Sequence, residues 1–308
     1  MMRTRSNRGS ATILMMLIAA VIVTIGVGFN WLVREHIRAS DGLKNKAEAI
    51  LKARSAYDTS IYLLLNGQLT RKEIIVAGTN EMIAGVTSLP LDGREVSLSE
   101  DLHVQIQESN GMISLASLKT GPLARLIKKT ANREDASIPV NSLIDWIDTD
   151  DLSMVGGAET FYYRSQGVPY VPRNFAIQYK DEVGFMKGFD HDLYSKIQPY
   201  LTILPSTGFN PNTAGDAVLM AYLDIDAESL KTLKDYMSKK AIASDMELFA
   251  LTGRRIAGYD EGVYFFPSPF MEITVRAGAP KSIYTIRCGV NLTQTSYSPF
   301  SIIYWSEE

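Results

Sequence analysis

The first feature of the chain is one uninterrupted apolar run from Thr12 to Val33. A helix rises about 1.5 Å per residue and the hydrocarbon core of a bilayer is about 30 Å thick, so roughly twenty such residues can cross it. Residues 10–33 are therefore predicted to form a transmembrane helix. Three arginines and no acidic residue precede the run, which predicts a cytoplasmic N-terminus and an external location for everything after Val33.

A cleaved secretory signal is the competing interpretation of this run. Such a signal has a shorter apolar core that ends in small residues of the A-x-A kind. Residues 27–30, Val-Gly-Phe-Asn, do not supply that ending. The sequence therefore favours a membrane span.

Helical spacing continues after Val33, although polar residues return. Steps of three and four connect Leu43, Ala47, Ile50, Arg54, Tyr57, Ile61 and Leu64. This spacing is typical of one face of an amphipathic helix. Residues 34–67 are predicted to extend the membrane helix and to pack against a globular domain. The alternative is an unrelated surface helix that follows the anchor.

Strand signals occur in two separate parts of the chain. Between residues 93 and 118 apolar and polar positions alternate, and Asn110-Gly111 supplies the residues of a tight turn, so a β-hairpin is predicted there. Alternation resumes at 270–276 and 282–290, which predicts a second hairpin, and at 300–305, which predicts a last strand.

The stretch between these strands is predicted to form short helices separated by Gly, Pro and Asn. The predicted helices cover 123–127, 140–147, 180–185, 192–197, 214–223, 227–237 and 241–248. The predicted fold class is therefore α+β, in which a long N-terminal helix packs on an antiparallel β-sheet. Residues 68–118 and 262–308 form that sheet, and residues 119–261 form a large all-helical domain inserted between its strands.

The start of the apolar run carries a family signal. Arg8-Gly9-Ser10 places a glycine directly before the helix. This resembles the type III signal of type IV pilins and pseudopilins, in which a prepilin peptidase cuts after the glycine and methylates the new N-terminus. By this resemblance residues 1–9 are a leader and the mature chain begins at Ser10. Most members have glutamate at the fifth mature position, where this chain has Leu14, and the K-type minor pseudopilins of the type II secretion system are the group that lacks it.

Further blocks follow the order of the K-type family over nearly the whole chain. They are Ser-Leu-Ile-Asp-Trp-Ile-Asp-Thr-Asp-Asp at 142–151, Gly-Ala-Glu at 157–159, Tyr-Tyr at 162–163, Pro-Tyr-Val-Pro at 169–172, Pro-Tyr-Leu-Thr-Ile-Leu-Pro at 199–205 and Asn-Pro-Asn-Thr-Ala at 210–214. The segment from the aspartate-rich block through Gly-Ala-Glu is the most specific. The chain thus resembles a K-type minor pseudopilin.

The resemblance implies a structural role at the tip of the periplasmic pseudopilus, which such a subunit caps and whose assembly it helps to initiate for protein export. The implied partners are the I- and J-type minor pseudopilins, the major pseudopilin and the prepilin peptidase. The implied location is the inner membrane, with a single span, a cytoplasmic N-terminus and a periplasmic C-terminal domain. At the fifth mature position, Leu14 cannot pair with a neighbouring N-terminal amine as a glutamate does.

An acidic block offers hard oxygen ligands for a cation. Its members are Asp145, Asp148, Asp150, Asp151 and Glu159. Ca²⁺ binds six to eight such oxygens, and a Gly-containing loop can wrap around it, but the spacing is not that of an EF-hand. From spacing alone, a solvated acidic turn competes with a metal site. The resemblance implies calcium for the helical domain, and Asp148, Asp151 and Glu159 are the first candidates for its ligands.

Two turns, 183–188 and 210–214, resemble halves of helix-hairpin-helix units, whose backbone N–H groups bind DNA phosphate. The alternative function is therefore a membrane-anchored pilus or competence protein that binds DNA. Acidic residues around these turns oppose phosphate binding. Capping of a helix near Ala214 by Asn212 or Thr213 is the simpler interpretation of the second turn.

Composition and motifs give no support for an enzyme. The net charge of −3 argues against general nucleic-acid affinity, and the single cysteine, Cys288, excludes an intramolecular disulfide. His36, His103 and His191 form no metal-binding pair, and no nucleotide loop or G-x-S-x-G turn is present. A membrane-tethered hydrolase that uses the acidic block as acid and base remains a third hypothesis.

Overall fold

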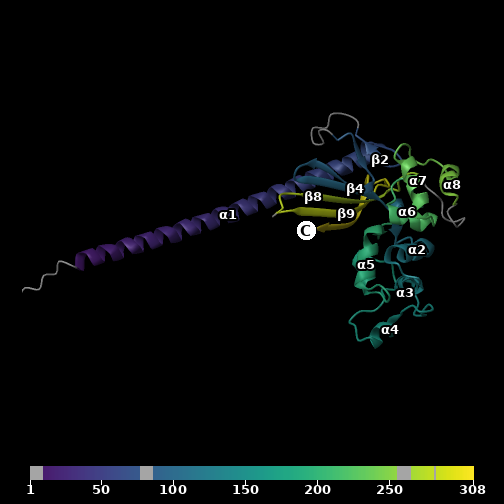
Figure 1. The fold of residues 1–308 in the computed structure, drawn as a ribbon, viewed down its shortest axis with the longest axis horizontal. Coiled ribbons are helices and arrows are strands. Elements are labelled where there is room, and N and C mark those ends of the chain that lie inside the picture. The colour runs from purple at the N-terminus through teal and green to yellow at the C-terminus, as the bar shows by residue number, and fades with distance from the viewer. Residues whose placement is uncertain (1–9, 77–85, 255–264, 281) are drawn as a thin grey trace, which may run out of the picture.

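The longest element is α1 (Ser10–Asn66), a helix of 57 residues. The computed structural model describes residues 10–76, 86–254, 265–280 and 282–308, so the predicted leader with Gly9 lies outside the described residues. Figure 1 shows the first half of α1 projecting away from the rest of the molecule, and all its described side chains up to residue 48 are exposed. Within the described chain, α1 alone is long and apolar enough to cross a membrane, with a window of mean hydropathy 2.6.

Only the last turns of α1 pack against the globular part. Their buried side chains include Ala49, Ala53, Ala56, Tyr57 and Ile61. The predicted stripe is therefore right from Tyr57 onward but wrong at Leu43, Ala47 and Arg54, which are exposed. The reason is that small alanines, rather than long apolar side chains, let the helix approach the sheet closely. A Cβ atom on Gly278, which has a φ of +105°, would lie 2.9 Å from the Ala49 Cβ.

The main sheet confirms the predicted antiparallel architecture. Its strands are β4 (Asp92–Ser99), β5 (Leu102–Glu108), β8 (Phe270–Ala277), β9 (Tyr284–Asn291) and β10 (Ser301–Glu307). They lie in the order β10-β9-β8-β5-β4, all antiparallel. Strand β4 was not singled out from the sequence, whereas β8, β9 and β10 match the predicted second hairpin and last strand.

One face of this sheet forms a core with α1, and the other face is mostly polar. Val104, Ile106, Ile273, Val275 and Cys288 are buried on the α1 side. Because side chains alternate between the faces of a strand, Gln105, Gln107, Glu272 and Thr274 lie on the opposite face. A separate small antiparallel sheet combines β1 (Gln68–Leu69), β2 (Glu73–Ile75) and β3 (Ser88–Pro90).

The predicted hairpin around Asn110-Gly111 is wrong. Strand β5 ends at Glu108 and is followed by the short 3₁₀ helix η2 (Ser109–Gly111) and β6 (Ile113–Ser114). Strand β6 pairs in parallel with the distant β7 (Leu201–Thr202) instead of turning back onto β5. The Asn110 side chain explains this, because its Oδ1 accepts the backbone N–H groups of Thr207 at 2.9 Å and Gly208 at 3.1 Å.

The helical lobe lies between β5 and β8, which are neighbours in the sheet. Its helices are α2 (Thr120–Ala131), α3 (Ser137–Ile147), α4 (Thr160–Ser165), α5 (His191–Ile197), α6 (Asp216–Leu223), α7 (Ala227–Met237) and α8 (Asp245–Thr252), with the 3₁₀ helices η3 (Lys180–Phe185) and η4 (Gln198–Tyr200). Helix α4 was not predicted, and α8 starts four residues later than expected. In Figure 1 the lobe lies at the opposite end of the sheet from the projecting part of α1, with α4 at its remote end.

The lobe has its own apolar core. Leu126, Trp146, Leu193, Phe209 and Leu233 belong to a cluster that is separate from the core between α1 and the sheet. The rings of Phe209 and Tyr222 stack with centroids 4.1 Å apart. Two independent cores are what two packed units in one chain require. The predicted end of the inserted domain, 261/262, lies outside the described residues.

A buried polar junction joins the lobe to the sheet. Glu108, fully buried at the end of β5, accepts hydrogen bonds from the backbone N–H groups of Asn110 at 2.8 Å and Ser268 at 3.0 Å, and from the Thr213 hydroxyl. The Asn212 side chain bonds both the N–H and the C=O of Ile242. These contacts join β5, the segment before α6, the segment before α8 and the entry to β8.

Candidate metal centre

Two helix ends bring three carboxylates together at the remote end of the lobe. Asp145 lies in the last turn of α3, Asp148 follows its end with extended backbone, and Glu159 precedes α4, also with extended backbone. One oxygen of each side chain lies within 4.8 Å of the other two. In the described part of the chain this is the one such group of acidic, histidine or cysteine side chains.

The three carboxylates are poorly satisfied by the protein itself. Asp145 is fully buried and Glu159 is 2 % exposed. Asp145 accepts the Met154 N–H at 3.0 Å, but both oxygens of Glu159 and Oδ1 of Asp148 are buried without a hydrogen-bond partner among the described residues. Buried charges without partners are costly, so this arrangement is one that a cation would stabilise.

Burial and neighbouring negative charges change the pKa values of two carboxyl groups in this cluster, those of Asp148 and Glu159. Burial, and then the nearby charges of Asp145, Asp148 and Asp151, raise the pKa of Glu159 to about 7. Burial, with the charges of Asp150 and Asp145, also raises the pKa of Asp148. Burial and mutual repulsion thus both disfavour the ionised forms when nothing positive lies between them.

The Gly156-Gly157 pair shapes the loop that closes the group. A Cβ on Gly157 would lie 2.1 Å from Asp145 Oδ2, which no real side chain can do, and Gly156 has a φ of +76°. The Gly157 carbonyl accepts a hydrogen bond from Lys187 Nζ at 3.0 Å. Only a glycine at 157 leaves room for the Asp145 carboxylate beside the loop.

The residues present fit a hard cation. The donors are carboxylate oxygens, with no sulfur and no imidazole, and this set suits Ca²⁺ rather than zinc. Three carboxylates supply up to six oxygens, and loop carbonyls and water can complete the six to eight that Ca²⁺ requires. Asp145, Asp148 and Glu159 are the residues that would bind it.

The other two predicted ligands lie outside this group. Asp150 and Asp151 are exposed; Asp150 Oδ1 accepts the Leu152 N–H at 2.8 Å and Asp151 Oδ1 accepts the Thr160 hydroxyl at 3.0 Å. Asp145, which was not among the first three candidates, takes the place given to Asp151. Its position in the last helical turn, three residues before Asp148, is the signal that points to it.

Of the two turns proposed to bind DNA, the second is buried, because Asn210, Asn212 and Thr213 lie in the junction with the sheet. In the first turn Val183 is buried within η3, whereas Gly184 and Phe185 are exposed. The capping interpretation is wrong, because α6 begins at residue 216 and Gly215 precedes it without a side-chain cap. Asn210 and Thr213 instead contribute to the polar junction.

Comparison with known proteins identifies relatives of this chain. Residues 104–206 match the family model described as type II secretion system protein K. The type II secretion system protein K of Pectobacterium carotovorum subsp. carotovorum is 24 % identical over 78 % of this chain and 76 % of its own length. The protein of the same name from Aeromonas hydrophila is 24 % identical over 80 % of each chain.

A solved structure is similar in fold. It is a chain of the crystal structure of the GspK-GspI-GspJ complex from the enterotoxigenic Escherichia coli type 2 secretion system. The TM-score is 0.55 at 17 % identity, over 90 % of this chain and 99 % of that one. The fold similarity therefore includes the helix, the sheet and the lobe.

Proposed function

We infer that the chain belongs to the type II secretion system protein K family, and we propose that it caps the tip of the periplasmic pseudopilus and helps to initiate its assembly for protein export. The observation that supports this proposal is that the two ends of the molecule differ. One end is an exposed apolar helix, and the other is a broad helical lobe beyond the sheet (Figure 1).

The exposed apolar half of α1 can be buried first in a membrane and then in a filament. Its first half exposes large apolar side chains such as Ile13, Met16 and Phe29, at 65–75 %. In the inner membrane, lipid covers this surface, and in a filament the helices of neighbouring subunits cover it, so burial favours both states. The predicted orientation, with the sheet and lobe in the periplasm, follows from the basic residues before the helix.

The lobe and Leu14 both favour a terminal position. At the fifth mature position, Leu14 offers no carboxylate to the N-terminal amine of a subunit above it. The lobe widens the molecule at the end opposite the projecting helix, and a further subunit cannot stack there without a clash. The I- and J-type minor pseudopilins are the proposed partners through helix packing, since the similar solved structure is a complex of the three.

The tip position can be tested by labelling. Full-length protein with an epitope tag after Glu308, expressed in place of the untagged protein, should place an antibody label at one end of each sheared pseudopilus. The intact mass of the same protein should show loss of Met1 to Gly9 and gain of one methyl group when the peptidase is present. Labels distributed along the filament would contradict the capping proposal, and an uncut N-terminus would contradict the proposed processing.

Calcium has a structural role in this proposal. When bound, the ion supplies positive charge that offsets the repulsion within the carboxylate group. The chain's part is to join the ends of α3 and α4 through Asp145, Asp148 and Glu159. The loop between them exposes Leu152 at 78 % and Val155 at 90 %. Binding at its two ends would restrict the conformations of this apolar loop.

We expect 1 mM Ca²⁺, compared with EDTA, to raise the melting temperature of the full chain by several degrees, because ligands that bind only the folded state stabilise it. Glu159→Gln should remove most of this difference. Asp235→Asn, which changes an exposed carboxylate on α7, should keep it. Differential scanning fluorimetry measures all three. An equal response to Ca²⁺ in the wild type and in Glu159→Gln would count against the metal centre.

A further inference from the structure

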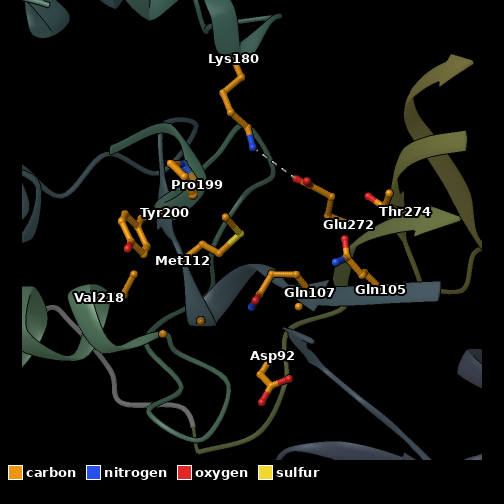
Figure 2. Close-up of a pocket in the computed structure, with 13 residues that line it drawn as sticks. Asp92, Gln105, Gln107, Met112, Lys180, Pro199, Tyr200, Val218, Glu272 and Thr274 are labelled. Carbon is orange, nitrogen blue, oxygen red and sulfur yellow. Dashed lines mark ion pairs between the residues drawn. The ribbon is translucent and has the colours of Figure 1, made fainter. Parts of the chain in front are cut away.

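A crevice lies where the outer face of the sheet meets the lobe. It is a partly open crevice of about 310 Å³, formed by residues of β4, β5 and β8 on one side and of η2, η3, η4 and α6 on the other. Figure 2 shows its side chains pointing into the space between these elements. Its volume is at the lower end of the range of small-molecule sites, which begins at about 300 Å³.

The sheet side of the crevice is polar. Cross-strand pairing places Gln107 between Asp92 on β4 and Glu272 on β8, and places Gln105 beside Thr274. Figure 2 shows these side chains along one side of the crevice. Planar carboxamide, carboxylate and hydroxyl groups together provide donors and acceptors within reach of one ligand.

Several of these groups lack partners within the protein. Among the described residues, no side-chain hydrogen bond engages the Gln105 carboxamide or the Thr274 hydroxyl. Glu272 Oε2 is buried without a hydrogen-bond partner in the described chain; Lys180 Nζ lies 3.9 Å from it, and the Tyr304 hydroxyl interacts with the same carboxylate group. A buried acceptor without a partner is costly, so a bound ligand that donates to Glu272 gains free energy there.

Apart from Lys180, the lobe side of the crevice is apolar. Met112, Pro199, Tyr200 and Val218 face the polar side across the space, as Figure 2 shows. Tyr200 is half-buried and presents an aromatic ring. A ligand that fits both sides must therefore have one apolar face and one polar edge.

The charges around the crevice favour a neutral ligand. Asp92 and Glu272 would repel an anion, and Lys180 would repel a cation. Each carboxylate has a basic neighbour, because Asp92 pairs with Arg94 at 2.8 Å and Glu272 lies near Lys180. The charges are thus balanced before any ligand arrives.

We propose that this crevice binds a neutral saccharide unit. The apolar C–H face of the sugar ring packs on Tyr200 and Met112, and its hydroxyl groups bond Gln105, Thr274 and Glu272. A sugar ring has the amphipathic shape, the neutral charge and the several hydroxyl donors that the crevice requires. The inference goes beyond the tip proposal and does not depend on it.

An extended peptide fits the crevice less well. Peptides that add to a sheet need an open strand edge with free backbone groups. The floor of this crevice is made of side chains from β5 and β8, and both strands are already paired on both sides. On these two strands only side chains are available to bind a ligand, and this favours the saccharide.

The test is a titration of the full chain in octaethylene glycol monododecyl ether, a detergent without a sugar head group. Isothermal titration calorimetry with cellobiose, maltose and N,N′-diacetylchitobiose should show saturable binding of at least one of them with a Kd of about 10 mM or tighter. Glucuronate and glucosamine should each bind at least about tenfold more weakly than the best neutral sugar. No binding by any of the three neutral sugars would overturn the proposal, as would equal binding of the charged ones.

Variants locate the binding. Tyr200→Ala and Gln105→Ala should each weaken the binding at least about tenfold, through loss of stacking and of a hydrogen bond. Tyr297→Ala and Gln166→Ala, which change exposed residues elsewhere, should leave it unchanged. If Tyr200→Ala does not fold, Thr274→Val, which keeps the side-chain shape, should still weaken binding. Unchanged binding in folded crevice variants would overturn the proposal, and so would binding of tetra-alanine without any sugar.

Discussion

Replacing Glu108 with alanine is expected to lower the free energy of unfolding by about 3 kcal/mol. The fully buried carboxyl group accepts hydrogen bonds from Asn110, Ser268 and Thr213. Its removal leaves two buried backbone donors without an acceptor, leaves the Thr213 hydroxyl with only the Asn210 carbonyl at 3.3 Å, and opens a cavity between the sheet and the lobe. Chemical denaturation of the full chain in detergent, followed by tryptophan fluorescence, measures the change.

The same residue predicts a dependence of stability on pH. Burial raises the pKa of Glu108 above its ordinary value of 4.5, although its hydrogen bonds act in the opposite direction. The folded state therefore binds a proton more tightly than the unfolded state does. Its contribution to stability is fully present below pH 4.5 and is lost as the pH rises through the raised pKa.

Glu108→Gln separates the hydrogen bonds from the charge. A glutamine oxygen can still accept the two backbone N–H groups, and its NH₂ group can donate to the Thr213 hydroxyl. We expect a loss of less than about 1 kcal/mol and no pH dependence from this site. Glu100→Ala, which changes an exposed residue, should cost less than about 0.5 kcal/mol. A loss in Glu108→Gln equal to that in Glu108→Ala would contradict this account of the junction.

Local periodicity was enough to predict the elements whose partners are close in sequence or whose pattern is long. Helix α1 continues to Asn66 as expected, because apolar spacing persists through the change from membrane to globular part. Strands β8 and β9 alternate cleanly and pair with each other. Helix α7 matches its predicted bounds, since Asp226 caps it and its apolar positions recur at helical spacing.

The failures share a physical cause, which is a partner far away in the chain. Asn110-Gly111 has the composition of a hairpin turn, yet Asn110 bonds Thr207 and Gly208, and the chain continues into β6. Asparagine is a residue type that often caps helices, yet the Asn212 side chain accepts a hydrogen bond from the backbone N–H of Ile242. A single sequence gives turn propensity but not the distant group that competes for the side chain.

The candidate site was predictable as a region but not as a ligand set. The acidic block is evident from composition, whereas the choice among its five carboxylates depends on how the end of α3 meets the start of α4. Asp148, Asp151 and Glu159 were preferred as the outward partners of a core side formed by Trp146 and Ile147. In the structure Asp145 replaces Asp151 in the group, because Asp145 is buried and Asp151 is exposed.

Replacing Glu182 with alanine is expected to destabilise the lobe by about 3 kcal/mol, because it removes the acceptor for several donors around a buried carboxylate and the partner of the exposed Arg173. Glu182 accepts two hydrogen bonds from Arg173, at 2.8 and 2.7 Å, and one from Trp146 Nε1 at 3.3 Å. The backbone N–H groups of Gln178 and Tyr179 donate to the same carboxylate. Trp146 lies in α3, and the other donors lie in the segment between α4 and η3.

The pH dependence at Glu182 has the opposite sign to that at Glu108. Burial alone would raise the pKa of Glu182, but the hydrogen bonds from Arg173, Tyr179 and Trp146 outweigh it and lower the pKa below 4.5. Its contribution is therefore present above pH 4.5 and is lost as the pH falls through the lowered pKa. The difference between wild type and Glu182→Ala should shrink at low pH, whereas Glu134→Ala, an exposed control in the lobe, should show little effect at any pH. Denaturation curves at pH 3.5 and 7 measure both, and a difference that grows on acidification would show that the Arg173 pair does not stabilise the lobe.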